Sequence, residues 1–125
     1  EALNRYETNL LNTQEDAANF LIKHSLVGNG VRLLCDLFHM NIEEQNVPET
    51  ITRLGNLSSD LIGHVHWADS NRRAMGLGHT DSNAIYRALN AAGYDKYLAA
   101  EVFPLPSPTE AASQTILSIE AFTSS

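Results

Sequence analysis

Val31-Arg32-Leu33-Leu34-Cys35-Asp36 is a short, mostly apolar run of strand length that ends in a carboxylate. Two similar runs follow it along the chain, from Leu61 to His66 and from Tyr97 to Val102. Short apolar runs bounded by turn residues are typical of strands that are buried in a parallel sheet. The sequence therefore predicts strands in these three places.

Helical patterns precede, separate and follow these runs. The first predicted helix covers about residues 14 to 26, after a cap at Thr13, and the second begins near Pro48. The third begins at Thr80 or Asp81, and the last begins at Ser107. In the first helix the residues at helical spacing are Ala17, Phe20, Leu21 and His24. The expected inner faces of the other three helices are Val47, Ile51 and Leu54, then Ala84, Ile85, Ala88, Leu89 and Ala92, and finally Ala112, Ile116 and Ile119.

Strands that alternate with helices predict parallel βα units, so the expected fold class is α/β. With a further strand that ends at Glu1, the three runs give about four βα units, which is half of an eight-stranded TIM barrel. A doubly wound sheet is the structural alternative. The glycine-rich turn that usually follows its first strand is missing, because Tyr6-Glu7-Thr8-Asn9 contains no glycine.

An ionisable side chain stands at the end of each expected strand. These residues are Glu1, Asp36, His66 and Glu101, at intervals of 35, 30 and 35 residues. Parallel barrels place their chemistry at the carboxyl ends of the strands, and one βα unit has about this length. Three carboxylates and an imidazole at one centre would repel one another without a cation, so the spacing favours a divalent metal site. Donors of this kind, without thiolate, favour Mn²⁺, Co²⁺ or Mg²⁺ over structural zinc, whereas each residue taken alone fits a helix cap or a hydrogen-bonded core position.

The composition narrows the class of protein. The chain of 125 residues has 43% apolar and 18% charged side chains, which suits about one domain. No apolar run approaches the ~20 residues of a membrane span, and a net charge of −7 is unfavourable for binding nucleic acid or an anionic membrane. The single Cys35 indicates a buried, reduced thiol and a cytoplasmic setting. Because no Met opens the chain, Glu1 is expected to stand within a longer sequence.

Three segments carry a resemblance to a known family. They are Glu1-Ala2-Leu3-Asn4-Arg5-Tyr6-Glu7, Asp36-Leu37-Phe38-His39-Met40-Asn41-Ile42-Glu43-Glu44 and His64-Val65-His66-Trp67-Ala68-Asp69-Ser70-Asn71-Arg72. Together with Gly76-Leu77-Gly78-His79, Gly93-Tyr94 and Ala100-Glu101, these segments resemble the ketose 3-epimerases of the D-tagatose and D-psicose type. That family is part of the xylose isomerase-like TIM-barrel superfamily. The resemblance covers most of the chain and implies that residues 1–125 are the C-terminal half of such a barrel.

The resemblance also implies roles for individual residues. Metal ligands would be Glu1, Asp36, His66 and Glu101. From the donor types given above, the expected metal is Mn²⁺ or Co²⁺, with Mg²⁺ as a further option. Glu1 and Glu101 would be the catalytic pair that removes and returns the proton at C3 of a ketose, through an enediolate. Substrate contacts would come from Glu7, His39 and Arg72.

Other functions compete with this interpretation. The chain could be a half-barrel without turnover that associates with itself, because its sheet edges and inward faces would lack partners. A metal-dependent apurinic endonuclease of the same superfamily would need more histidine ligands and a basic groove, which the net charge of −7 disfavours. We therefore expect a sugar epimerase or isomerase that forms homo-oligomers and binds neither nucleic acid nor membranes. Trp67 and Cys35 are expected in the core, and His64 either in the core or beside His66.

Overall fold

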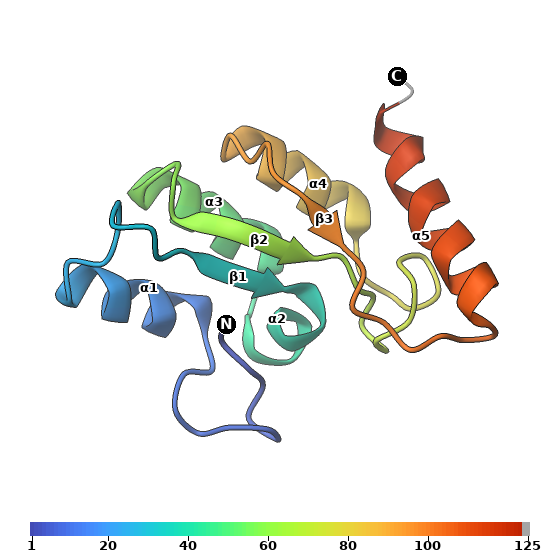
Figure 1. Cartoon of the computed structure of the whole chain (residues 1–125), viewed down its shortest axis with the longest axis horizontal. Coiled ribbons are helices and arrows are strands. Elements are labelled where there is room, and N and C mark those ends of the chain that lie inside the picture. Colours follow the sequence, from blue (N-terminus) through green and yellow to red (C-terminus); the bar gives the residue numbers. More distant parts are fainter. Residues whose placement is uncertain (124–125) are drawn as a thin grey trace.

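The computed structural model describes residues 1–123 and has the predicted α/β architecture (Figure 1). One open sheet of three parallel strands has the order β1-β2-β3. The helices and strands, in chain order, are α1 (Gln14–Lys23), β1 (Leu33–Asp36), α2 (Leu37–Glu43), α3 (Val47–Leu57), β2 (Ile62–His66), α4 (Ser82–Ala91), β3 (Leu98–Ala99) and α5 (Pro108–Thr123).

The strands are shorter than the apolar runs that predict them. β1 begins at Leu33 rather than at Val31, and β3 contains only Leu98 and Ala99. β3 is an edge strand that pairs only with the last two residues of β2, and one further bond joins Trp67 N–H to the Ala99 carbonyl at 2.7 Å. Hydrogen bonding to the neighbour, and not hydrophobicity alone, sets the length of a strand.

The middle helices follow the predicted faces, whereas the outer helices depart from them. Ile51, Leu54, Ile85 and Leu89 are buried as expected. In α1, Phe20 is exposed, and Ala18 is buried beside Ala17 and Leu21. The prediction for the last helix was wrong for two residues, because α5 buries Ala111 and Thr115 while Ala112 and Ile116 are exposed. Both helices lie at the ends of the row of elements in Figure 1, where a helix is covered on fewer sides and periodicity alone does not define its buried side.

The short helix α2 was not predicted. It starts directly after β1 because the buried Asp36 side chain caps its first turn, accepting the N–H of Phe38 at 2.9 Å and that of His39 at 3.3 Å. An acid in this position satisfies N–H groups that a helix start leaves unpaired. The strand therefore turns into a helix without a loop, which keeps His39 close to the strand end.

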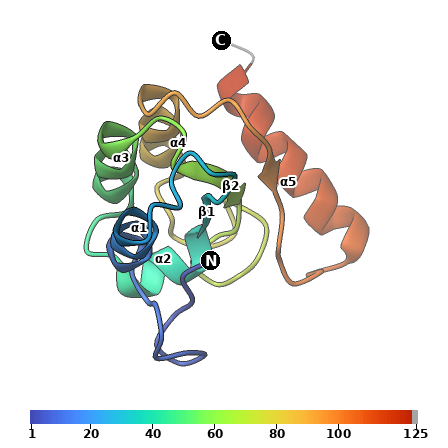
Figure 2. The same ribbon diagram turned by 60° about the vertical axis from the view of Figure 1, so that its left-hand side comes forward.

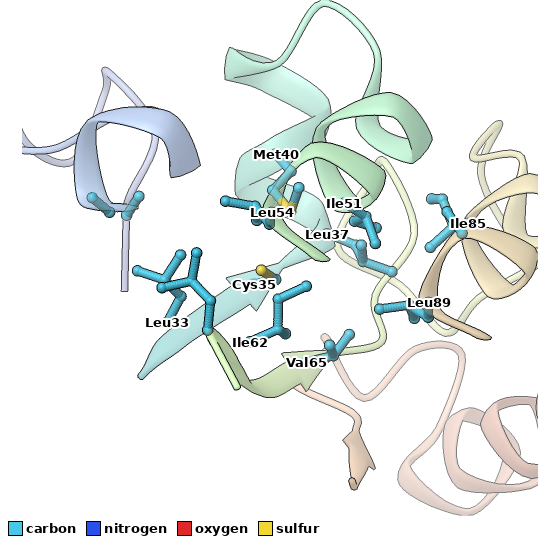
Figure 3. Packing of buried hydrophobic residues seen from close by; sticks show 14 of the residues in the cluster. Leu33, Cys35, Leu37, Met40, Ile51, Leu54, Ile62, Val65, Ile85 and Leu89 are labelled. Atoms are coloured by element: carbon cyan, nitrogen blue, oxygen red, sulfur yellow. The ribbon is translucent and has the colours of Figure 1, made fainter. Parts of the chain in front are cut away.

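The core lies between the sheet and the helices α3 and α4. Figure 3 shows Cys35 and Val65 of the strands directed toward Leu54 of α3 and Leu89 of α4, and all four are buried. Figure 2 shows α3 and α4 next to each other on one side of the sheet. A register shift at Gly63 places Ile62 and Val65 on this same side, although an unbroken alternation would separate them.

The same shift leaves His64 and His66 on the opposite face of the sheet, where both side chains are half-buried. A side chain at Gly63 would collide with Arg32 of the neighbouring chain segment, at 2.5 Å from its Cβ.

No helix within the described residues is long and apolar enough to cross a membrane.

Candidate functional site

The four residues expected at strand ends come together in space. Glu1, Asp36, His66 and Glu101 each offer a ligand atom, and these atoms lie within 4.8 Å of one another. Asp36 and His66 end the paired strands β1 and β2 and are register partners. Glu101 follows β3 by two residues, and Glu1 belongs to residues 1–13, which contain no helix or strand. Only two of the four are thus held by strands, and loops bring in the other two.

Asp36 combines the two roles that the sequence left open for it. Its carboxylate is fully buried, and one oxygen accepts the N–H groups at the start of α2. The other oxygen lies 2.9 Å from Nδ1 of His66. The helix cap therefore fixes the carboxylate while leaving one oxygen directed at the cluster.

The cluster is crowded with negative charge. His66 Nδ1 lies 3.3 Å from a Glu101 oxygen and 3.9 Å from a Glu1 oxygen, in addition to Asp36. Three carboxylates at such distances repel one another unless a cation or a proton offsets their charge. Three oxygen donors and one nitrogen donor at this spacing fit a divalent cation, so these four residues could hold a metal ion.

A second group of polar residues joins the cluster through His39. The backbone N–H of Asn4 points at His39 Nδ1 at 3.2 Å, and the Asn4 side-chain amide lies 2.8 Å from the same nitrogen. The tautomer with the proton on Nε2 lets Nδ1 accept the backbone N–H of Asn4. Nε2 faces Glu1 at 3.7 Å, and Glu7 lies 3.2 Å from Nδ1. His39 therefore has an N–H available on the side of the cluster.

Arg72 reaches the cluster from the loop after β2. Its guanidinium donates to Glu101 at 2.7 Å and stands 4.7 Å from the centre of the Phe38 ring. The Arg72 backbone has a φ of 58°, which is unusual for a residue other than glycine. All seven residues expected at the site, Glu1, Glu7, Asp36, His39, His66, Arg72 and Glu101, thus belong to one connected group.

The loop that carries Arg72 is organised by a buried acid, Asp69. Its carboxylate is fully buried and accepts backbone N–H groups from four residues of the same loop. The donors are Ser70 at 2.7 Å, Gly76 at 2.7 Å, Gly78 at 2.9 Å and Thr80 at 3.0 Å. Burial by itself raises the pKa of Asp69, but the hydrogen bonds outweigh it and lower the pKa to about 2.

Sequence reasoning missed Asn4 and Asp69 as parts of this arrangement. Both are buried polar residues in segments without helical or strand periodicity. The only signal in the sequence is that Asp69 precedes Gly76 and Gly78 in a loop, where glycine permits close approach of the backbone. That signal does not say which N–H groups an acid will bind.

The remaining predictions near the site concern packing. Trp67 is buried, its indole N–H donates to Ser118 at 3.0 Å, and its ring lies edge-on to Phe122, so it is a core residue as expected. Cys35 is buried and free, and burial raises its pKa to about 12. His64 lies against His66, with the ring centres 5.3 Å apart.

Comparisons with known proteins agree with this geometry. Residues 1–121 match the family described as xylose isomerase-like TIM barrel. The 3-dehydro-D-guloside 4-epimerase of Escherichia coli (strain K12) is 37% identical over 101 residues, covering 81% of this chain and 36% of the relative. The D-psicose 3-epimerase of Enterocloster bolteae is 36% identical over 109 residues, covering 87% of this chain and 34% of the relative. The chain thus spans about a third of the length of these curated relatives.

A solved structure shows the same fold. The apo form of 3-keto-D-glucoside 4-epimerase from E. coli superimposes with a TM-score of 0.83 and 31% sequence identity. The match covers 96% of this chain and 44% of that one. The parallel βα elements of this chain therefore correspond to part of a TIM barrel.

We expect Asp69→Asn to lower stability in a pH-dependent way. A carboxylate whose pKa falls from 3.8 to about 2 on folding contributes about 2 kcal/mol at neutral pH. Because the pKa is lowered, this contribution is complete above about pH 4 and is lost as the pH falls through about 2. Urea unfolding of both proteins between pH 7 and pH 2 should show a difference that shrinks in acid, and a constant difference would contradict the assignment.

Proposed function

This chain belongs to the xylose isomerase-like TIM-barrel family, and from that premise we propose that it provides the active-site half of a metal-dependent sugar epimerase. The proposed reaction inverts C3 of a ketose. The observation that carries the proposal is the convergence of Glu1, Asp36, His66 and Glu101 to within 4.8 Å. The curated names of the relatives, which are 3-epimerases and a 4-epimerase of sugars, support the reaction class.

In this proposal the four convergent residues are the metal ligands. Their donor atoms, one imidazole nitrogen with carboxylate oxygens, suit Mn²⁺ or Co²⁺, and Mg²⁺ is also compatible. When bound, such an ion supplies Lewis acidity that makes a proton next to a ketone easier to remove. The buried Asp36 is the best supported of these ligands, because α2 fixes its orientation.

Glu1 and Glu101 are the proposed acid-base pair. They approach His66 from two different segments, the chain start and the loop after β3, and both are partly open to solvent. One carboxylate removes the proton at C3 and the other returns a proton to the opposite face, so the configuration inverts. Which carboxylate acts first depends on the epimer that is bound.

His39, Glu7 and Arg72 are the proposed substrate contacts. The Nε2 proton of His39 and the guanidinium of Arg72 are hydrogen-bond donors that can bind sugar oxygens and the negative charge that develops on them. Glu7, held by the Asn4 amide at 2.7 Å, can accept from a sugar hydroxyl. The acidic surroundings and the net charge of −7 support a neutral sugar over nucleic acid as substrate.

A second candidate reaction is inversion at C4 of a 3-keto sugar. The 3-keto-D-glucoside 4-epimerase matches this chain with a TM-score of 0.83, and a curated 4-epimerase is 37% identical. In both reactions the inverted carbon bears a hydroxyl and adjoins a ketone. The same carboxylate pair could therefore serve either one, and the position of hydrogen exchange in the product separates them.

The cellular setting belongs to the same proposal. A buried, unpaired Cys35 fits a reducing compartment such as the cytoplasm. We further propose that residues 1–125 correspond to the C-terminal half of a barrel. The order of the motifs along the chain and the 44% share of the solved 4-epimerase that it covers support this assignment.

Metal binding should be measurable by stability. Addition of Mn²⁺ at about 100 times its dissociation constant should raise the free energy of unfolding by roughly 2.7 kcal/mol, and a chelator should reverse the gain. Asp36→Asn should remove most of the effect. Asp60→Asn is the matched control, since Asp60 is half-buried, lies outside the cluster and pairs with Arg32 at 2.9 Å. Identical melting curves with Mn²⁺ and with chelator would contradict the proposed site.

The chemistry should be visible as isotope exchange. In D₂O, the metal-loaded protein should place deuterium at C3 of D-fructose or D-tagatose while forming the epimer. Glu101→Gln should slow this exchange by roughly 10²- to 10⁴-fold, because it removes one member of the acid-base pair. Arg72→Ala should weaken substrate binding and leave Mn²⁺ binding in place. Deuterium at C4 of a 3-keto-glycoside, without exchange in free ketoses, would favour the second reaction.

Self-association stays a prediction. The outer edges of β1 and β3 have no strand partner within residues 1–123, and Ile116 and Leu117 of α5 are exposed. Covering such surfaces with a second copy would remove apolar area from water. Light scattering coupled to size-exclusion chromatography should give about twice the 13.7 kDa of one chain or a larger multiple. A monomer at every concentration would contradict this expectation.

A further inference from the structure

We propose that Asp69 is a positioning residue that holds the Arg72 and Glu101 pair in place for the substrate. The inference rests on the proposed function for the roles of those two residues. Asp69 itself does not touch the cluster of candidate ligands. It acts on the loop between β2 and α4, and three separate observations connect that loop to the site.

The first observation is the way Asp69 closes the loop. Its two oxygens accept four backbone N–H groups, from Ser70 next to it and from Gly76, Gly78 and Thr80 up to eleven residues further along the chain. A single buried anion therefore ties both ends of the loop to one point. A side chain at Gly78 would collide with this carboxylate, and Gly76 has a φ of 97°, so the two glycines fit the closed form of the loop.

The second observation is the strained backbone at Arg72. A φ of 58° costs a residue with a side chain energy that its surroundings must offset. The backbone of Asp69 forms hydrogen bonds with Arg72 and with the next residue, Arg73. Its carbonyl accepts the Arg72 N–H at 2.9 Å, and its own N–H donates to the Arg73 carbonyl at 3.0 Å. The side chain and the backbone of Asp69 thus both hold the turn that positions Arg72.

The third observation joins the loop to the segment that carries Glu101. The Phe103 N–H donates to the Arg72 carbonyl at 2.7 Å, and the Arg72 guanidinium donates to Glu101 at 2.7 Å. Arg72 is therefore bound to the segment after β3 by its backbone and by its side chain. A displacement of the loop would move Arg72 and release Glu101 together.

The site is built from backbone N–H groups around an anion, so its occupant can be exchanged. Asp69→Ala removes the carboxylate and leaves four N–H groups directed at the space it occupied. Formate has the same carboxylate group and is small enough to replace it. Asp69→Ala with formate bound to these four N–H groups should recover the closed loop, whereas chloride at equal ionic strength should be a poorer substitute.

The first test needs no activity. Amide hydrogen exchange should be faster in Asp69→Asn than in the unmodified protein at Gly76, Gly78 and Thr80, and also at Phe103, which lies outside the loop. Asp81→Asn is the matched control, because Asp81 belongs to the same loop but caps only α4, at Ala84. Faster exchange in the loop with an unchanged Phe103 amide would overturn the proposal, since the loop would then not be coupled to the Glu101 segment.

The second test uses the metal-loaded protein and the C3 exchange reaction. Asp69→Ala should raise KM for the ketose about tenfold through misplacement of Arg72, and it should also lower kcat, because Glu101 loses the Arg72 contact that holds it. Mn²⁺ should still bind, since Asp36 and His66 keep their positions at the strand ends. Partial unfolding would lower kcat without raising KM. Formate should bring the KM of Asp69→Ala back toward the original value. If Asp69→Ala does not fold, Asp69→Asn replaces it for the KM measurement, and formate should then have no effect because the amide still fills the space.

The outcomes distinguish failure of the proposed function from failure of the positioning role of Asp69. If the unmodified protein exchanges no proton in any ketose or keto-glycoside, the proposed function is wrong. The amide hydrogen-exchange test then still decides whether Asp69 couples the loop to the Glu101 segment. An active protein whose Asp69 variants keep the original KM overturns the positioning role. A raised KM that formate lowers and chloride does not lower supports it.

Discussion

The mutual repulsion of Glu1, Asp36 and Glu101 around His66 is the constraint on which the rest of the structure depends. Ligand atoms within 4.8 Å of one another are costly for a folded chain unless positive charge offsets them. Several parts of the surrounding structure reduce this electrostatic cost. Helix α2 stabilises Asp36 through its first N–H groups, Arg72 neutralises part of Glu101, and the remaining donors fit a divalent ion. The fold can hold these groups together because β1, β2 and β3 are parallel and their carboxyl ends meet at one edge.

Two buried carboxylates illustrate how the environment divides structural from chemical roles. Asp36 uses one oxygen for α2 and directs the other at His66, so it can serve as a ligand. Both oxygens of Asp69 accept backbone N–H groups of its own loop, and these hydrogen bonds lower its pKa to about 2. A carboxylate whose two oxygens are both bound in this way is not free to act as a ligand or a base, but it can hold the loop that carries Arg72.

Membership in the xylose isomerase-like TIM-barrel family gives these groups a common chemical interpretation. The curated relatives include sugar 3-epimerases and a 4-epimerase, and each name describes inversion at a carbon of a keto sugar or of a related glycoside. A pair of carboxylates that flanks a metal site can invert a carbon next to a ketone whatever its number in the sugar. In the proposed function, selection between C3 and C4 would depend on the position of the sugar, to which the proposed contacts His39, Glu7 and Arg72 would contribute.

The sequence by itself determined the α/β class and the residues of the candidate cluster, because apolar runs alternate with helical patterns and end in Asp36 and His66. These are local signals, and β1 and β2 end where their apolar runs stop. Tertiary structure alone decided the parts that depend on neighbours. The length of β3 follows from its pairing with β2, and the buried side of α5 follows from its position at the end of the row of helices. Asn4 and Asp69 gain their roles from backbone N–H groups and ring nitrogens that lie far away in the sequence or in irregular loops. Periodicity cannot report such bonds, because their geometry exists only once the chain has folded.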